Sequence, residues 1–382
     1  MMIYLDNSAT TYPKPQSVIN SFNISMQNYG ANFGRGIYDM SIKTAEQIYL
    51  VREKVANFFD VPLVENVVFT NNCTHALNIA IKGIANKGSH YIISDLEHNS
   101  VVRPLEKLKT KSECDYSVAN VEFNIEKTVS NFEKQINKNT VAIICTGASN
   151  VFGIVTPFRE LAKLAHKHNL LFILDASQIA GLVDISMKSD EIDIICCSGH
   201  KYLYGPVGTG LLLINENVKQ FDTLIEGGTG SNSMDLSMPN ELPDRFESGT
   251  INTAGIISLG KGIDFVEKYK KDNIFKHEYN LINGLYAFFN KHKEYKIYTK
   301  FNEKTSVPII SFNLRNMPSE FVAGELSKDN IAVRAGLHCA PLAHKKFGTA
   351  KNGTIRVSPS IFTKKSHIDL LIKSLIKIAK FK

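Results

Sequence analysis

The sequence predicts an α/β protein whose central sheet is mostly parallel. The first observation is a series of short, β-branched apolar runs that have the length of strands and lack polar alternation, as in strands buried on both faces. These runs cover 67–70, 91–95, 141–146, 171–175, 192–198 and 210–214. The second observation is that segments with helical period lie between them, an alternation typical of helices packed on a parallel sheet.

The segment 157–169 illustrates the predicted helices. Phe158, Leu161 and Leu164 recur at helical spacing and form one apolar face. Pro157 suits the first helical position, because its missing N–H has no partner there in any case. The segment is therefore predicted to be an amphipathic helix that covers the sheet.

The pattern changes in the last third of the chain. A long helix is predicted over 256–269, and after it helices mix with isolated strands such as 307–313. A lysine-rich helix is predicted from about residue 365 to the end. This mixture is typical of an α+β unit and not of a continued parallel sheet.

The length of 382 residues fits two or three domains. We see no internal repeat, low-complexity tract or long linker, so any second domain is expected to pack closely on the first. We predict a large α/β domain over 15–262 and a smaller α+β domain formed by 1–14 and 263–382, which would carry the loop around Cys339.

Composition excludes several classes of protein. No run of about 18 uncharged apolar residues is present, which argues against a membrane span. The first residues lack the layout of a secretory signal, so we expect a cytoplasmic protein. The six cysteines are too sparse for a disulfide framework and form no C-x-x-C pair, so reduced thiols and no structural metal are expected.

The net charge of +7 comes from 44 Lys and Arg against 37 Asp and Glu. Much of the excess is lysine scattered through the last third of the chain. Scattered lysines predict a solvated face and not a nucleic-acid groove, although a basic surface also favours anionic ligands or an acidic protein partner.

Polar residues that follow the predicted strands are the candidate site residues, because ligands bind beyond the carboxyl ends of strands in open α/β sheets. After 67–70, Cys73 and Thr74 lead into a helix and offer a thiol, a hydroxyl and free N–H groups that suit a phosphate. Taken alone, this segment favours an ordinary Asn or Thr helix cap.

The next strand ends carry His98, Asn150, Asp175 and Gln178. A lone histidine is more often structural than catalytic. A carboxylate that closes an apolar strand is costly to bury unless it meets a cation or hydrogen-bond donors, so Asp175 is expected to face a positive partner.

Lys201 follows the predicted strand 192–198, between Ser198, His200 and a Gly-Pro turn. An amine at a buried strand end loses solvation, so its pKa falls and a Schiff base with an aldehyde becomes accessible. The cofactor that needs such a lysine, an aspartate at a pyridine nitrogen and a phosphate seat is pyridoxal phosphate.

Five segments together resemble the class V aminotransferase family, and within it the cysteine desulfurases of the branch that is also similar to selenocysteine lyases. The segments are YLDNSATT at 4–11, LDASQ at 174–178, SGHK at 198–201, FESGT at 246–250 and RAGLHCA at 334–340. The resemblance covers the chain from Tyr4 to about Ser360 and implies a fold type I, pyridoxal-phosphate-dependent large domain in a homodimer.

The resemblance also implies roles for individual residues. Lys201 would bind the cofactor aldehyde, Asp175 its ring nitrogen and Gln178 its ring hydroxyl. His98 would stack on the ring and move protons. The phosphate would be held by Thr74, Ser198 and His200, with Cys73 in place of a second threonine and with Thr250 from the second subunit.

Cys339 is the residue that would make this a sulfur enzyme. We expect His338 and Arg334 to lower its thiol pKa. The resemblance implies that L-cysteine is converted to alanine with a persulfide on Cys339, whose sulfur passes to an acceptor for iron–sulfur cluster assembly or thiolation. Arg356, helped by Asn150, would bind the substrate carboxylate bidentately.

Two residues depart from the family pattern, namely Cys73 and Leu337, which stands where many relatives carry a second histidine. Selenocysteine lysis, amino transfer or racemisation on the same cofactor is therefore an alternative activity. An alternative of another class is a non-catalytic, cofactor-bound scaffold that docks assembly proteins.

Overall fold

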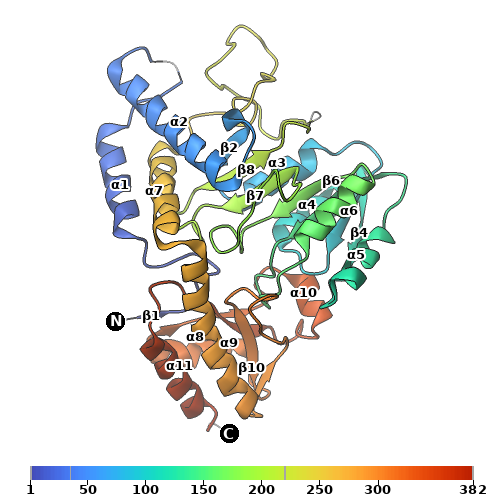
Figure 1. The fold of residues 1–382 in the computed structure, drawn as a ribbon, viewed down its shortest axis with the longest axis vertical. Helices are drawn as coiled ribbons and strands as arrows, with labels where there is room; N and C mark the ends of the chain where they lie inside the picture. Colours follow the sequence, from blue (N-terminus) through green and yellow to red (C-terminus); the bar gives the residue numbers. More distant parts are fainter. Residues whose placement is uncertain (1, 35, 219–220, 381–382) are drawn as a thin grey trace.

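A computed structural model describes residues 2–34, 36–218 and 221–380 (Figure 1). Its main element is a seven-stranded sheet with the strand order β2-β8-β7-β6-β5-β3-β4. Every neighbouring pair is parallel except the two that involve β8, which runs antiparallel to both β2 and β7. The strands are β2 (Val67–Thr70), β3 (Ser89–Ser94), β4 (Cys114–Ala119), β5 (Thr140–Thr146), β6 (Leu171–Asp175), β7 (Ile194–Ser198) and β8 (Gly210–Ile214).

The predicted mostly parallel sheet is thus confirmed, and the six predicted strands are buried on both faces. Alternate residues of one strand enter different cores: Ile143 and Cys145 of β5 lie in one, Ala142 and Ile144 in the other. Strand β4 was not predicted, because it is an edge strand in which polar residues such as Asp115 and Ser117 interrupt the apolar run.

Helices cover both faces of this sheet. On one face lie α3 (Cys73–Gly83) and α4 (Asn99–Thr110). On the other lie α2 (Asp39–Phe59), α5 (Ile125–Glu133), α6 (Phe158–Lys167) and α7 (Thr253–Tyr269), while α1 (Gln16–Asn28) packs on α7. Helix α6 begins one residue later than predicted, because Pro157 is its cap and not its first residue. A short 3-10 helix, η1 (Val64–Asn66), leads into β2.

A second unit lies below the large sheet in Figure 1 and contains a four-stranded antiparallel sheet with the order β12-β13-β10-β9. Its elements are α8 (Lys271–Lys291), β9 (Tyr295–Ile297), β10 (Ile310–Leu314), α9 (Ser319–Lys328), β11 (Ile331–Ala332), β12 (Arg334–Gly336), α10 (Pro341–Lys346), β13 (Thr354–Val357) and α11 (Lys365–Ile378). Strand β1 (Ile3–Tyr4) pairs with β11, so the start of the chain packs with residues more than 300 positions away.

The domain boundaries stay a prediction, but position 262 lies inside α7, which continues to Tyr269. The chain changes direction at Lys270, whose positive φ of 66° separates α7 from α8. Amphipathic period alone does not mark such a break, because apolar residues continue across it.

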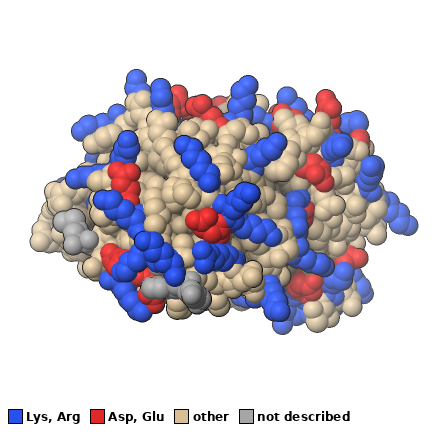
Figure 2. Space-filling view, turned by 90° about the horizontal axis from the view of Figure 1, so that it is seen from below, with Lys and Arg blue, Asp and Glu red and all other residues tan. Residues whose placement is uncertain are grey.

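Figure 2 shows the molecule from below relative to Figure 1. Lysine and arginine side chains are spread across this face, with aspartate and glutamate among them. This spread is typical of a solvated face. None of the described helices combines the length and the apolar character that crossing a membrane requires.

A buried ion pair fixes the outer strand β2 to the chain after β8. Arg52 of α2 donates to both carboxylate oxygens of Glu247, each at 2.8 Å, and the backbone N–H of Phe69 donates to Glu247 at 2.7 Å. Both charged side chains are buried. The removal of one partner of such a pair leaves an uncompensated buried charge, which is strongly destabilising.

We therefore expect Glu247→Gln to lower the free energy of unfolding by about 3–5 kcal/mol. The measurement is urea unfolding followed by circular dichroism. Asp115→Asn, which breaks an exposed ion pair with Lys109, is the matched control and should change stability by less than about 0.5 kcal/mol. Equal stabilities of the two variants would contradict the importance of the buried pair.

Candidate active site

A cavity of about 190 Å³ lies at the carboxyl ends of the parallel strands. It is lined by Asn72, Cys73, Thr74, His98, Ser100, Thr146, Asn150, Asp175, Ser177, Gln178, Ser198, His200 and Lys201. Nine of the twelve predicted site residues are therefore brought together. Thr250, Cys339 and Arg356 lie outside this lining.

Asp175 and Lys201 form the charged centre of the cavity. Asp175 ends β6, is only 4% exposed, and accepts a hydrogen bond of 2.9 Å from the backbone N–H of Ser177. Burial lowers the pKa of Lys201, and the nearby charge of Asp175 acts in the opposite direction. The expected positive partner of Asp175 is thus present.

The N-terminal segment holds the backbone on either side of the Lys201 side chain. Thr11 Oγ1 donates to the carbonyl of Lys201 at 3.1 Å, and Lys14 Nζ donates to the carbonyl of His200 at 2.7 Å. The Thr10 hydroxyl also donates to His200, at 3.2 Å. Sequence analysis missed these contacts, although the YLDNSATT segment was the available signal.

The helix N-terminus beside the cavity is capped by Asn72, whose side chain accepts from the His75 N–H at 2.9 Å. Helix α3 therefore begins at Cys73. The Cys73 thiol donates to Asp175 at 3.5 Å. Its side chain thus faces the carboxylate, whereas we expected it among the phosphate-binding hydroxyls.

His98 caps helix α4 and is neutral. Burial and the charge of Lys201 lower the pKa of His98 to about 4. Its Nδ1 accepts from the backbone N–H of Ser100 at 3.1 Å and lies 2.7 Å from the Ser100 hydroxyl, which assigns the ring proton to Nε2. The Ser100 hydroxyl also lies 2.7 Å from that of Thr74. The sequence did not indicate Ser100, whose hydroxyl links the two predicted site residues His98 and Thr74.

Two buried polar atoms of the cavity have no hydrogen-bond partner among the described residues: Gln178 Oε1 and His200 Nδ1. The amide nitrogen of Gln178 donates to the Ser8 carbonyl at 3.1 Å, so the amide orientation is set. Buried polar groups in native proteins are nearly always paired. These two atoms therefore indicate that a polar molecule belongs in the cavity.

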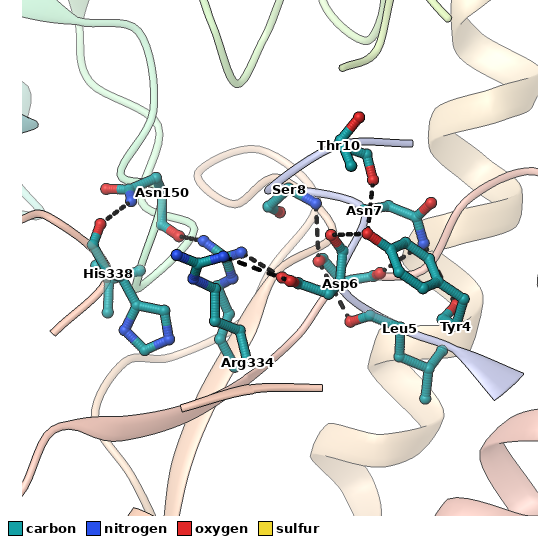
Figure 3. Close-up of polar contacts among 12 residues, drawn as sticks. Tyr4, Leu5, Asp6, Asn7, Ser8, Thr10, Asn150, Arg334 and His338 are labelled. Carbon is teal, nitrogen blue, oxygen red and sulfur yellow. Dashed lines mark hydrogen bonds and ion pairs between the residues drawn. The ribbon is translucent and has the colours of Figure 1, made fainter. Parts of the chain in front are cut away.

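Arg356 contacts Asn150 and is only 2% exposed, so it is not a surface cation. Its Nη1 donates to the Asn150 carbonyl at 2.8 Å and its Nη2 to Asp6 at 2.6 Å. Asn150 in turn donates to the His338 carbonyl at 2.7 Å (Figure 3). Arg356 Nε is buried without a partner among the described residues, so part of the guanidinium stays available for a ligand.

Cys339 is exposed, whereas the other five cysteines are buried. His338 and Cys339 both have positive φ, 49° and 56°, a conformation that non-glycine residues adopt rarely. The Cys339 carbonyl accepts from the N–H of Asn99 at 2.7 Å, directly after His98. The Cys339 loop is therefore bonded to Asn99, next to His98, and to Asn150 of the cavity lining.

The expected influence of His338 and Arg334 on the Cys339 thiol stays a prediction, and the imidazole of His338 is itself neutral. Burial and the charge of Arg356 lower the pKa of His338 to about 2, so its ring is neutral and carries no charge that would favour a thiolate. The ring instead stacks on His344, with 5.6 Å between centroids, and His344 Nδ1 lies 2.7 Å from the Thr349 hydroxyl. No group of three or more His, Cys, Asp or Glu within residues 2–34, 36–218 and 221–380 is arranged to hold a metal.

Thr250 is exposed and lies 3.5 Å from the Asn32 side chain, in a different pocket from Lys201. The chain from 221 to 252 contains no helix or strand. The predicted contribution of Thr250 to the phosphate site of a second subunit stays a prediction.

A sequence profile described as aminotransferase class V matches residues 3–371. The chain belongs to the class V aminotransferase family. It is 31% identical to a "Probable cysteine desulfurase" of Methanothermobacter thermautotrophicus, over 99% of this chain and 94% of the relative. It is also 31% identical to a protein of the same name from Halalkalibacterium halodurans, over 100% of this chain and 94% of the relative.

Solved structures show the same class V fold. The apo structure of a cysteine desulfurase from Thermococcus onnurineus superposes with a TM-score of 0.91 and 30% identity, covering 99% of this chain and 95% of that chain. The Escherichia coli cysteine desulfurase CsdA, at 22% identity and covering 99% and 94%, gives 0.87 and shows the fold alone.

Pyridoxal phosphate is the cofactor of class V enzymes, and the residues of the cavity fit it. Lys201 supplies an amine of lowered pKa and Asp175 a buried carboxylate. The first turn of α3 offers free N–H groups that suit a phosphate. The unpartnered atoms of Gln178 and His200 lie in the same lining.

Glu97, beside His98, is fully buried and joins the ends of two strands. Its Oε1 accepts from the Ser94 hydroxyl at 2.5 Å and from the Thr146 N–H at 2.8 Å. Burial raises the pKa of Glu97 to about 8. The folded protein therefore holds this carboxyl protonated over a pH range in which the unfolded chain has already lost the proton.

From about pH 5 to pH 8 the folded state binds more protons at Glu97 than the unfolded state, so stability falls as pH rises. Glu97→Gln removes this titrating group, so the variant should not lose stability in this way. Relative to the wild type, its free energy of unfolding should therefore increase by about 2–4 kcal/mol from pH 5 to pH 8. Urea unfolding at pH 5, 6.5 and 8 measures the difference. Glu113→Gln, at an exposed carboxylate, should leave it unchanged; parallel pH profiles of wild type and Glu97→Gln would refute the assignment.

Proposed function

We propose that this protein is a pyridoxal-phosphate-dependent cysteine desulfurase that converts L-cysteine to L-alanine and leaves a persulfide on Cys339. The observation that carries the proposal is the placement of the exposed Cys339. Its backbone is bonded to Asn99, next to His98, and its loop to Asn150 of the cavity lining. The names of relatives that span the whole chain support the same activity.

In this proposal Lys201 binds the cofactor aldehyde, and Asp175 lies at the ring nitrogen. When bound, pyridoxal phosphate supplies an electron sink for charge that develops at the substrate α-carbon. The lowered pKa of Lys201 increases the share of free amine, the form that can bond to an aldehyde or accept a proton.

The phosphate is assigned to the first turn of α3, with Thr74, Ser198 and His200 as side-chain contacts and Thr250 from a second subunit. His200 is neutral, because burial and the charge of Lys201 lower its pKa to about 4. Gln178 is assigned to the ring hydroxyl, and its unpartnered Oε1 is an acceptor for it.

His98 covers the cofactor in this proposal and moves protons. A neutral imidazole can take up a proton and return it, and the pKa of about 4 keeps His98 neutral at physiological pH. Ser100 holds Nδ1, which orients the ring.

Arg356 and Asn150 are assigned to the substrate carboxylate. Arg356 reaches it with the N–H groups that Asp6 and the Asn150 carbonyl leave free, including the buried Nε. The bidentate contact expected from sequence is assigned to Nε together with an N–H of a terminal nitrogen.

Cys339 as a thiolate then attacks the sulfur of the substrate. A bond forms between the two sulfurs while the bond from substrate sulfur to its β-carbon breaks, and the electron pair stays with the carbon skeleton, which is protonated to alanine. The terminal sulfur of the persulfide leaves to an acceptor of iron–sulfur cluster assembly or thiolation. L-Cysteine is the substrate, and the active form is a homodimer.

We expect the purified holoprotein to release sulfide and alanine in equal amounts from L-cysteine in the presence of a thiol reductant. Cys339→Ala should reduce sulfide release at least about 100-fold while keeping the cofactor absorbance, because only the acceptor thiol is lost. Cys114→Ala, at a buried thiol of β4, is the control and should retain activity. Unchanged sulfide release by Cys339→Ala would exclude Cys339 as the acceptor.

Borohydride reduction of the holoprotein should attach one pyridoxyl phosphate group to Lys201. Peptide mass spectrometry after proteolysis locates the group, and Lys201→Ala should carry none. Lys14→Ala tests whether the other lysine of lowered pKa, about 7 because of burial, reacts instead. A label on a residue other than Lys201 would overturn the assignment.

A further inference from the structure

The thiol of Cys73 lies against the carboxylate of the cavity. Cys73 is the first residue of α3, and it lines the cavity together with Asp175 and Lys201. Its side chain is buried, and its Sγ donates to Oδ1 of Asp175 at 3.5 Å. A thiol has a single proton to donate, so a thiol that donates to a carboxylate cannot donate to a phosphate at the same time.

Two donors meet at the same oxygen of Asp175. The backbone N–H of Ser177 donates to Oδ1 at 2.9 Å, in addition to the Cys73 thiol. No residue within 2–34, 36–218 and 221–380 donates a hydrogen bond to Oδ2. The two bonds to Oδ1 restrict rotation of the carboxylate, and Oδ2 is the oxygen that remains free for a donor in the cavity.

No neighbouring side chain duplicates the bond from Cys73. The hydroxyl of Ser177 lies 3.3 Å from the hydroxyl of Ser198, and the two other nearby thiols, Cys196 and Cys197 of β7, lie outside the cavity lining. Among the described residues, Cys73 is therefore the one side chain that donates to the carboxylate at the end of β6.

The surroundings keep the Cys73 thiol protonated. Burial and the charge of Asp175 both raise its pKa, because a thiolate there would place a second negative charge beside the carboxylate. The thiol therefore remains a donor. A hydrogen bond to the ionised form of a carboxylic acid stabilises that form, and an ionised Asp175 is the partner that a protonated ring nitrogen needs.

We propose that Cys73 is a positioning residue for the pyridine ring of the cofactor and not a phosphate contact. Its thiol and the N–H of Ser177 hold Oδ1 of Asp175, which leaves Oδ2 for the ring nitrogen. This inference rests on the cofactor assignment of the proposed function, with Asp175 at the ring nitrogen, and is independent of the sulfur chemistry at Cys339.

The test compares pyridoxal phosphate with pyridoxal, which has the same ring and aldehyde but no phosphate. The full-length protein is stripped of cofactor and titrated with each compound, and binding is followed by visible absorbance. In Cys73→Ala, the apparent dissociation constants of both compounds should increase by the same factor, about three- to tenfold, as expected when a charged group loses a weak donor. A role of the thiol at the phosphate would instead weaken pyridoxal phosphate alone.

Two further variants separate the donor from the sulfur atom and from general packing. Cys73→Ser keeps a donor at the same position and should bind both compounds within about twofold of the wild type. Cys114→Ala removes a buried thiol of β4 that lies outside the cavity lining, so it should leave both constants unchanged.

A double-mutant cycle tests whether Cys73 acts through Asp175. In an Asp175→Asn background the carboxylate is gone, so the further substitution Cys73→Ala should weaken pyridoxal phosphate less than it does in the wild type. An equal loss in the two backgrounds would show that Cys73 acts on its own and would overturn its positioning role.

Unchanged constants in Cys73→Ala, a loss confined to pyridoxal phosphate, or an equal loss in Cys73→Ser would also overturn this inference, and each would leave the proposed function intact. A wild-type protein that binds neither compound, and that releases no sulfide from L-cysteine after addition of pyridoxal phosphate, would instead overturn the proposed function and this inference together.

Discussion

The structure depends on one electrostatic constraint, a buried carboxylate at the end of β6 beside a half-buried amine that follows β7. Asp175 is costly to bury without a positive partner, and Lys201 loses solvation in the same place. Each makes the other tolerable, and the sheet brings them together because β6 and β7 are parallel neighbours. The same desolvation that makes the pair costly lowers the pKa of Lys201 and gives the site its chemistry.

The N-terminal segment connects this pair to the second unit. Thr11 and Lys14 bond to the carbonyls of Lys201 and His200, while Asp6, a few residues earlier, bonds to Arg356. Strand β1 is itself paired with β11. A single short segment thus sets both the backbone beside the amine and the guanidinium assigned to the substrate, so the two ends of the site cannot shift independently.

The Cys339 loop shows how exposure and restraint are combined. Cys339 is exposed, but its backbone is bonded to Asn99 and its loop to Asn150, in a conformation with positive φ. Neutral His338 stacks on His344 beneath the loop and acts by packing, not by charge. Leu337, two residues before Cys339, is half-exposed.

The sequence by itself determined the parallel sheet, because uninterrupted β-branched runs are strands buried on both faces, and it determined most of the cavity, because strand ends of a parallel sheet meet at one edge. Asp175, Lys201 and His98 were found this way. Tertiary structure alone decided the roles of Asp6, Lys14 and Ser100. Their partners lie far away in the chain or depend on a rotamer, and neither periodicity nor spacing records such contacts. It also decided that His338 is neutral, since a pKa follows burial and neighbouring charge, which exist only in the folded chain.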